Sequence, residues 1–225
     1  HIMDGSIERE PIDQNHFFDY FNQIFSSQSK CTIDPTTCIP DKSVLHYIDE
    51  KFILDFLKDK SKSSPGIDGI SSTALLPFAK ELQVLLNWCV RCKRIPDSWR
   101  HSKTSLIPKK RSCRPEDHRP ISVSSVMYRC LTAAMAKRMS KDFPLSQFQK
   151  GFIESDGICE AITTMKYIMK NHPTARIASL DISKAFDNLS QEAILVTCQN
   201  RGLDKDSLDM ITDLYTDCST ILANG

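Results

Sequence analysis

Apolar residues recur with helical spacing along most of this 225-residue chain. Near its start, Phe17, Phe21 and Ile24 stand at positions i, i+4 and i+7, and Asp13 precedes them as a candidate N-cap. The chain is therefore expected to be rich in helices. The same period, bounded by Ser, Asp, Pro or Gly, predicts further helices over residues 49–60, from Pro77 past Cys89, from Ser124 or Ser125 to Lys141, and over residues 156–172, 190–202 and 207–215.

Each longer helix presents one apolar stripe, which we expect to face a common core. With 40% apolar residues, the chain is long enough to bury a sizeable one. The expected inward residues are Phe52, Ile53, Phe56 and Leu57; Phe78, Leu82, Leu85, Leu86 and Cys89; Leu131, Ala134, Met135 and Met139; and Ile158, Ala161, Ile162, Met165 and Ile168.

Extended segments are few. The stretches "KTSLIPKK" (103–110) and "RPISV" (119–123) flank the charged turn "RSCRPEDH" (111–118), which predicts a β-hairpin. The stretch "RIASLDI" (176–182) predicts a strand, and the terminal "STILANG" (219–225) is a further candidate. Because helices dominate and strands are confined to these places, the predicted fold class is α+β.

Charge is distributed unevenly although the net charge is only +1. Residues 91–141 hold 14 Lys and Arg against 3 Asp and Glu. Such a basic segment attracts phosphate backbones through counterion release and long-range steering. A solvated charged face is the alternative.

Nine cysteines are present, and no apolar run approaches the roughly 18 residues that a membrane-spanning helix needs. No secretory pattern opens the sequence, so we expect reduced thiols in an intracellular protein without a membrane segment. Cys89-x-x-Cys92, with Cys113 and His118, has ligand types and gaps that suit zinc. A core role for Cys89 is favoured instead, because it continues the apolar stripe of its helix.

Asp181 lies within the predicted strand 176–182. Because strand residues alternate between faces, Leu180 and Ile182 can pack on one side while Asp181 is presented on the other. There its oxygens could bind a hard cation. The alternative is an Asp that caps a helix or pairs with a nearby Lys or Arg.

The string "SLDISKAF" resembles motif A of reverse transcriptases, in which an Asp is followed by Ala four positions later and an aromatic residue five positions later. Four other segments resemble motifs of the same family in the same order, from about residue 50 to the end of the chain. The set is most similar to the non-LTR (LINE-type) retrotransposon enzymes, particularly the site-specific clade that inserts into ribosomal DNA. The segments are "SPGIDGI" (64–70), "LIPKK" (106–110), "HRPISV" (118–123) and "FQKGFIESDGICEAI" (148–162).

This resemblance implies an N-terminal extension (1–45), helix-rich fingers with a β-hairpin (46–172) and the first part of a right-hand polymerase palm (173–225). It implies two-metal catalysis with Mg²⁺, in which Asp181 binds both ions and the carbonyl of Ile182 holds one. Lys109 and Arg119 match positions that contact the triphosphate, and Arg suits this role because its planar fork grips two oxygens.

The resemblance also assigns residues around the nucleotide and the template. Ala185 and Phe186 match the nucleotide site, where the bulky ring of Phe186 would exclude a 2′-hydroxyl. Gln149, Gly151 and Phe152 match a segment that lines the template side. A core Phe186 and a helix-entry turn at Gly151 are the alternatives.

The Tyr-x-Asp-Asp hairpin of such enzymes is missing. "YTDC" (215–218) imitates it, but we expect a helix end there without flanking strands, and Cys218 replaces the second acid. The chain therefore looks like a fragment that is inactive alone. Its parent is expected to be an RNA-directed DNA polymerase acting in the nucleus on an RNA template, a DNA primer and dNTPs. A nucleic-acid-binding or homodimerising module without catalysis is the alternative, and a domesticated structural protein is a third reading.

Overall fold

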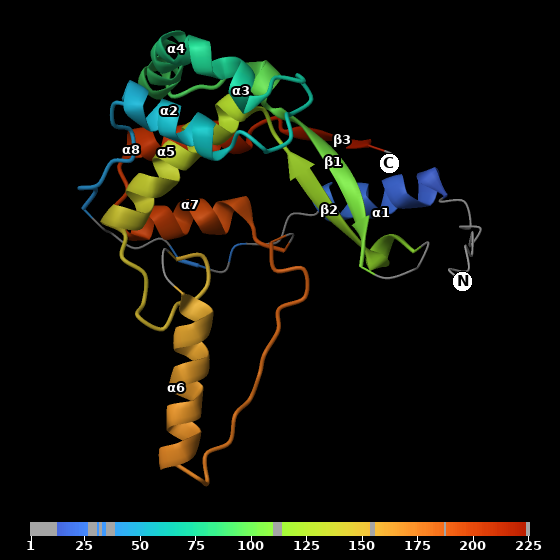
Figure 1. The fold of residues 1–225 in the computed structure, drawn as a ribbon, viewed down its shortest axis with the longest axis vertical. Coiled ribbons are helices and arrows are strands. Elements are labelled where there is room, and N and C mark those ends of the chain that lie inside the picture. The colour runs from blue at the N-terminus through green and yellow to red at the C-terminus, as the bar shows by residue number, and fades with distance from the viewer. Residues whose placement is uncertain are drawn as a thin grey trace, which may run out of the picture.

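The computed structural model describes residues 13–26, 31, 33–34, 39–109, 114–153, 156–186 and 188–223. Most of them form a helical body, from which a small sheet extends to one side with one helix along it (Figure 1). The predicted α+β class is confirmed. The body contains α2 (Glu50–Asp59), α3 (Ser72–Leu75), α4 (Ala79–Cys92), α5 (Val126–Asp142), α7 (Gln191–Asn200) and α8 (Lys205–Tyr215).

One core runs through this body. The apolar stripes of α2, α4 and α5 meet in it, and Leu57, Leu86 and Leu131 are fully buried there. Met210 of α8 joins the same cluster. Because the cluster extends from Val44 to Leu214, it crosses the domain boundaries expected near residues 45 and 172, which remain predictions.

Polar caps determine where the helices begin. The side chains of Asp13, Ser125, Asp156 and Ser190 each accept hydrogen bonds from backbone N–H groups of the first turn, as expected from the sequence, and Asp49 caps α2 in the same way. After α7, the chain turns at Gly202 with φ of 87°, a left-handed conformation that suits glycine.

Two helix starts differ from the prediction. The helix expected from Pro77 begins at Ser72 as α3 and passes through the 3₁₀ turn η1 (Leu76–Phe78). Phe78 lies on this turn and is 57% exposed, so its predicted burial is wrong. The last helix, α8, begins at Lys205 because the Asp204 side chain caps it, accepting from the backbone N–H of Ser207 at 2.8 Å.

The sheet has the order β2-β1-β3. The predicted hairpin is confirmed, since β1 (His101–Pro108) pairs antiparallel with β2 (His118–Val123). The terminal candidate is also a strand, β3 (Ser219–Ala223), which pairs parallel with β1. The sheet therefore brings residues 219–223 beside the hairpin, although they are about 100 positions apart in the chain.

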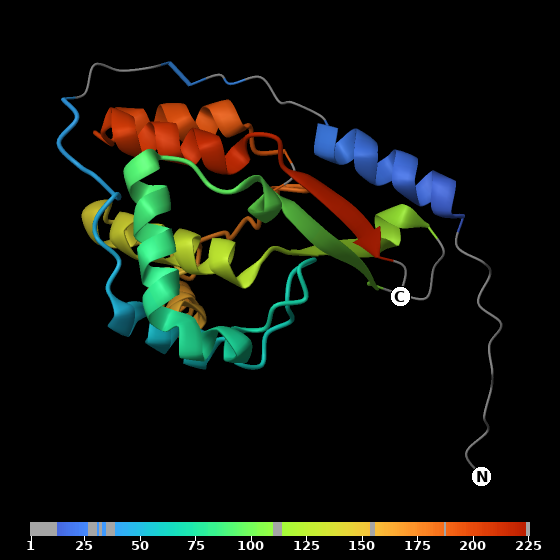
Figure 2. The same cartoon turned by 90° about the horizontal axis from the view of Figure 1, so that it is seen from above.

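One face of the sheet is covered by α1 (Gln14–Ser26), as the two views in Figures 1 and 2 show. Phe17 and Phe21 of α1 are buried, and the Phe17 ring meets the His118 ring edge-on at 4.9 Å. Thr104 is fully buried on β1, where its hydroxyl contacts the hydroxyls of Ser122 (2.6 Å) and Thr220 (2.5 Å) on the neighbouring strands. These contacts satisfy a polar group that would otherwise be costly to bury.

Residues 156–186 form an arm that projects from the body (Figure 1). It consists of α6 (Gly157–Asn171) and the chain that returns from its far end. The expected strand 176–182 is wrong, because these residues adopt no strand in the structure. A strand needs a neighbour for its backbone hydrogen bonds, and no described residue pairs with this segment.

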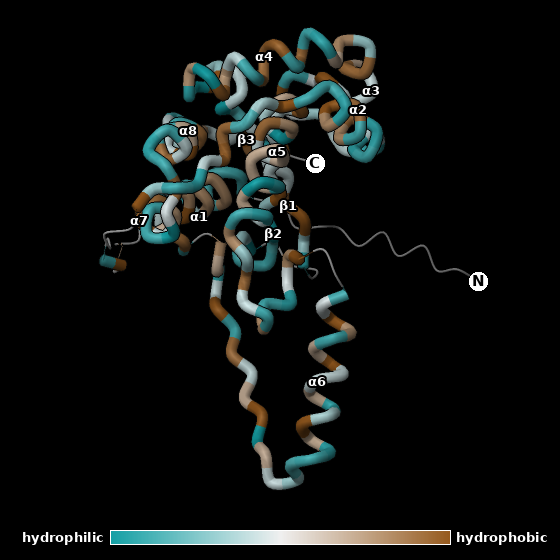
Figure 3. Tube along the Cα trace, turned by 90° about the vertical axis from the view of Figure 1, so that its left-hand side faces the viewer, coloured by the Kyte–Doolittle hydropathy of each residue, from teal (hydrophilic) through white to brown (hydrophobic). Residues whose placement is uncertain are grey.

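The predicted burial of the α6 stripe is also wrong. Its large apolar residues are exposed by 42% to 76%, and only Gly157 of this helix is buried. Figure 3 shows apolar positions recurring along α6 while the helix stands apart from the body. Helical spacing was thus correctly recognised, but the described residues provide nothing for the stripe to pack against. The exposed residues are Ile158, Ile162, Met165 and Ile168.

Candidate functional site

The face of the sheet turned away from α1 carries one group of candidate residues. Arg119 on β2 is exposed and stands opposite Ile107 of β1. Lys103, two pairs further along the same face, is also exposed and lies between Val123 and Ile221. None of the described residues that alternate onto this face is acidic.

This open face combines apolar surface with positive charge. Ile107, Ile121 and Ile221 are 52%, 40% and 58% exposed. Exposed apolar surface of this extent often marks a binding site, and cations without nearby acids favour an anionic ligand. Lys103 was not singled out from the sequence, because only the strand register places it on the face of Arg119.

Lys109 lies just beyond β1, at the same end of the hairpin as Arg119. Its backbone N–H donates to the carbonyl of Asp117 at 2.7 Å, and its Nζ donates to the carbonyl of Glu116 at 3.2 Å. The hairpin therefore brings the two predicted triphosphate contacts to one end of the sheet. In this structure the lysine amine is directed to the turn.

Asp181 lies on the returning chain of the arm, and its side chain is exposed. It forms no ion pair with any described residue, so the pairing alternative is not observed. The next residues form a turn in which Asn188 donates to the carbonyl of Ser183 at 2.8 Å. Lys184 in this turn places its amine 4.7 Å from the centre of the Tyr20 ring on α1.

Phe152 and Phe186 are in contact although they are 34 positions apart. Their ring centres are 6.0 Å apart and their planes are nearly perpendicular, an edge-to-face arrangement. Both rings are largely exposed, at 93% and 79%, so the core alternative for Phe186 does not hold in this structure. The structure thus brings the predicted template segment next to the predicted nucleotide segment.

The loop before α6 is closed by local contacts. The Gln149 side-chain amide donates to the carbonyl of Gly151 at 2.9 Å, and Phe152 follows with a φ of 58°. A β-carbon at Gly157 would lie 1.9 Å from the carbonyl oxygen of Lys150. Gly157 is therefore required for the close approach of this loop to α6, a role that the sequence reading missed although Asp-Gly at 156–157 signals a special backbone position.

Arg100 was also missed. It is 6% exposed, and its Nη2 donates to both carboxylate oxygens of Asp213 at 3.0 Å. Its Nη1 donates to the carbonyl of Thr216 at 2.9 Å and to that of Asp213. These bonds hold the C-terminal end of α8 against the start of β1, and thereby set where β3 begins. No sequence spacing indicates this pair, because the two residues are 113 positions apart.

The "YTDC" segment is not a carboxylate hairpin. Tyr215 ends α8 as predicted, and the Cys218 thiol donates to the carbonyl of Leu214 at 3.1 Å. The expectation that no strand flanks this segment is wrong, since β3 begins at Ser219. A single acid, Asp217, lies in the turn between them with a φ of 50°.

The zinc alternative finds no support in the described residues. His118 is buried, and its Nδ1 donates to the carbonyl of Arg114 at 2.9 Å. Burial raises the pKa of the Cys89 thiol to about 11, which disfavours the thiolate that zinc requires. Cys113 lies outside the described residues.

The resemblance implies a divalent metal at Asp181, so the donors near this residue decide whether the segment can hold one. The Asp181 carboxylate and the Ile182 carbonyl are hard oxygen donors of the type Mg²⁺ prefers. However, the described residues contain no group of three or more His, Cys, Asp or Glu side chains placed to bind a metal. Among the described residues, Asp181 and Ile182 therefore offer suitable donors but no complete metal site.

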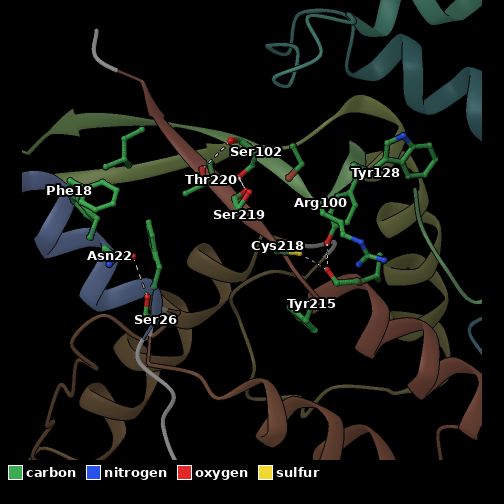
Figure 4. Close-up of a pocket in the computed structure, with 17 residues that line it drawn as sticks. Phe18, Asn22, Ser26, Arg100, Ser102, Tyr128, Tyr215, Cys218, Ser219 and Thr220 are labelled. Carbon is green, nitrogen blue, oxygen red and sulfur yellow. Dashed lines mark hydrogen bonds between the residues drawn. The ribbon is translucent and has the colours of Figure 1, made fainter. Parts of the chain in front are cut away.

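A cavity of about 510 Å³ lies between α1, β3 and the end of α8 (Figure 4). Its labelled residues include Phe18 of α1 and the hydroxyl-bearing Ser219 and Thr220 of β3. The Arg100 guanidinium at its wall is already bonded to Asp213 and Thr216. The cavity lacks Asp181, Lys109 and Arg119, so it is separate from the predicted catalytic residues.

Among the described residues, none of the helices has the length and apolar content needed to cross a bilayer. Residues 107–224 match the family model described as reverse transcriptase (RNA-dependent DNA polymerase). This range contains the end of β1, all of β2, the arm and β3.

Curated relatives agree with this match. The chain is 36% identical over 170 residues to the retrovirus-related Pol polyprotein from type-2 retrotransposable element R2DM of Drosophila melanogaster, covering 72% of this chain and 16% of that protein. It is 29% identical over 174 residues to the Pol polyprotein from type-1 retrotransposable element R2 of Popillia japonica, covering 75% and 24%. A similar R2 polyprotein of Nasonia vitripennis is 28% identical over 169 residues, covering 72% and 16%. The chain thus spans less than a quarter of the length of these relatives.

Proposed function

Because the chain belongs to the reverse transcriptase family, in its non-LTR retrotransposon branch, we propose that it is the fingers and proximal palm of an RNA-directed DNA polymerase. The complete protein copies retrotransposon RNA into DNA from the 3′ end of a nicked target-DNA primer. Its substrates are an RNA template, a DNA primer and dNTPs, and its site of action is the nucleus, where the target DNA lies.

The open face of the sheet is the observation that supports a nucleotide-binding role most directly. It presents exposed Arg119 and Lys103 beside three exposed isoleucines and no described acid. Arg119 and Lys109 at the hairpin end bind the triphosphate of the incoming nucleotide, since guanidinium and ammonium groups form charge-assisted hydrogen bonds with phosphate oxygens. The neighbouring apolar face suits a base.

Asp181 is the catalytic carboxylate in this proposal. In the complete enzyme the Asp181 carboxylate and the Ile182 carbonyl would hold a divalent metal ion. When bound, such an ion would supply activation of the primer 3′-hydroxyl and offset charge on the triphosphate. Ala185 and Phe186 border the sugar, where the Phe186 ring excludes a 2′-hydroxyl. Gln149, Gly151 and Phe152 border the template, and the observed contact of Phe152 with Phe186 supports their closeness.

The proposed role of this 225-residue chain on its own is different. We propose that it binds nucleic acid without catalysing polymerisation, because the described residues do not complete a metal site. A homodimer is a second candidate, which the exposed apolar stripe of α6 favours.

A steady-state assay of the complete polymerase tests the nucleotide assignment. Lys109→Ala together with Arg119→Ala is expected to lower kcat/KM for dNTPs about 10- to 100-fold, the scale for losing hydrogen bonds to a charged group. Lys58→Ala, which removes an exposed lysine of α2, serves as the control. Unchanged kcat/KM in the double variant would contradict the assignment.

Asp181→Asn tests the catalytic assignment in the same protein. It should lower kcat more than about 100-fold, because charge stabilisation in the transition state is lost. Affinity for the RNA template should stay unchanged, and Asp217→Asn should leave kcat nearly as it is. If Asp181→Asn and Asp217→Asn changed kcat equally, Asp181 would not be the catalytic carboxylate.

A further inference from the structure

The outward face of α4 carries an exposed aromatic patch. Trp88 is 64% exposed and Val84, one turn earlier, is 70% exposed. The opposite face of α4 is buried in the core through Leu82, Leu86 and Cys89. In Figure 2, which views the molecule from above, α4 is the green helix on the outside of the body.

Two cations lie on the same side of the helix as this pair. Lys80, Val84, Trp88 and Arg91 follow one another at spacings of four, four and three, which places them along one face. Both Lys80 and Arg91 are exposed, and neither has an ion-pair partner among the described residues. The nearest acid on the helix surface is Glu81, which is exposed, adjoins Lys80 and lies two turns before Trp88.

We propose that this outer face of α4 binds single-stranded nucleic acid, with one base stacked on Trp88 and phosphates at Lys80 and Arg91. A base stacks on an aromatic side chain regardless of sequence, and flanking cations attract the backbone. Lys80 and Arg91 are eleven positions apart in the helix, a distance of about 16 Å along the axis. That length accommodates about four or five stacked nucleotides at roughly 3.4 Å each.

The size of the patch favours a nucleic acid over a protein. A stable protein interface takes roughly 20 residues from each partner, whereas this patch consists of four residues bordered by Glu81 and Cys92. Binding of one strand requires only a stacking surface and a few cations. The α4 surface belongs to a different element from the open face of the sheet, so it extends the proposed function to a second contact with the strand.

Trp88 gives a direct optical readout. The chain contains two tryptophans, and the other one, Trp99, is buried at 4% exposure. Adding oligo(U) or oligo(dT) of about 12 nucleotides to the 225-residue chain should quench the accessible tryptophan emission as a base stacks on the indole. Heparin, a polyanion without bases, should bind without comparable quenching. The ratio of the RNA and DNA affinities then identifies the preferred strand.

Substitutions separate stacking from charge. Trp88→Ala should weaken oligonucleotide binding about tenfold, and Trp88→Phe should restore part of the affinity. Lys80→Glu with Arg91→Glu should lower the dependence of log K on log salt by about 1.4, since two phosphate contacts are lost. The matched control, Lys58→Glu with Lys205→Glu, makes the same charge change elsewhere on exposed helix positions.

Three results would overturn the proposal. If the oligonucleotide bound without quenching Trp88 emission, the strand would bind elsewhere on the protein. If Arg119→Ala then weakened that binding, the proposed function would still hold. If heparin quenched Trp88 emission equally, binding at this patch would depend on charge and not on base stacking. A dimer in light scattering that Trp88→Ala converts to a monomer would make this face an interface between copies of the chain.

Discussion

Two helices of similar length, α5 in the body and α6 in the arm, show how differently the chain uses amphipathic sequence. Five residues of α5 are buried, including Cys130, Leu131 and Met135, whereas only Gly157 of α6 is buried. Both helices have a capping side chain at the predicted place. Capping and spacing are local properties and form a helix in either setting, but burial requires a partner surface.

The same contrast holds for the extended segments. β1 is paired on both sides, by β2 and β3, while residues 176–182 adopt no strand. Arg119, which is proposed to bind phosphate, thus lies on a formed sheet, whereas Asp181, which is proposed to be catalytic, lies on a segment that pairs with no described residue.

The largest effect is expected at the buried ion pair that fixes α8 to the sheet. Arg100→Ala should lower the free energy of unfolding by about 3 kcal/mol, because the Asp213 carboxylate, whose side chain is only 15% exposed, loses its two guanidinium hydrogen bonds and keeps the one from the Ile95 N–H. Urea denaturation monitored by circular dichroism measures this loss.

Arg94→Ala is the matched control. Arg94 also approaches Asp213, at 3.9 Å, but its side chain is 75% exposed. Its removal should cost at most about 0.5 kcal/mol. Similar losses for both variants would mean that burial does not distinguish the two arginines.

Two side-chain substitutions, one in the core and one in the arm, test whether burial differs between the body and the arm. Leu86→Ala in α4 should cost about 2–5 kcal/mol, because a fully buried side chain leaves a cavity. Ile162→Ala in α6 removes a similar side chain that is 48% exposed, and should cost less than about 0.5 kcal/mol. A large loss for Ile162→Ala in the same denaturation experiment would show that the α6 stripe is covered in solution.

The smallest effect is expected from alkaline pH. Burial raises the pKa of the Cys130 thiol from 9.0 to about 12, whereas Cys159 in the arm is exposed. The folded state retains the Cys130 proton that the unfolded state releases, so this contribution to stability is complete below pH 9 and is lost as pH rises toward 12. Cys130→Ala should flatten that decline in unfolding curves recorded between pH 8 and 11.

Thiol labelling checks the same difference at one pH. At pH 8, a disulfide reagent should modify the exposed thiols of Cys92, Cys159 and Cys218 rapidly and Cys130 only when the protein unfolds, because Cys130 is buried. The Cys159→Ser variant, which should lose part of the fast phase, provides the control. A fast phase that loses amplitude in Cys130→Ala would contradict the buried position of Cys130.

Local sequence determined the helices, their caps, the hairpin and the order of family motifs. Residues such as Asp49, Ser125 and Gly202 act within one helical turn, so their roles can be predicted from neighbours alone. The same is true of the alternation that forms β1 and β2.

Only the tertiary structure decided which surfaces meet. It paired Arg100 with Asp213, placed Lys103 on the face of Arg119, brought Phe152 to Phe186, and left the α6 stripe and residues 176–182 without a partner. The physical reason is that burial and strand pairing depend on contacts between residues far apart in the chain. A periodic pattern specifies that a face is apolar, but the packing of the whole molecule determines what covers it.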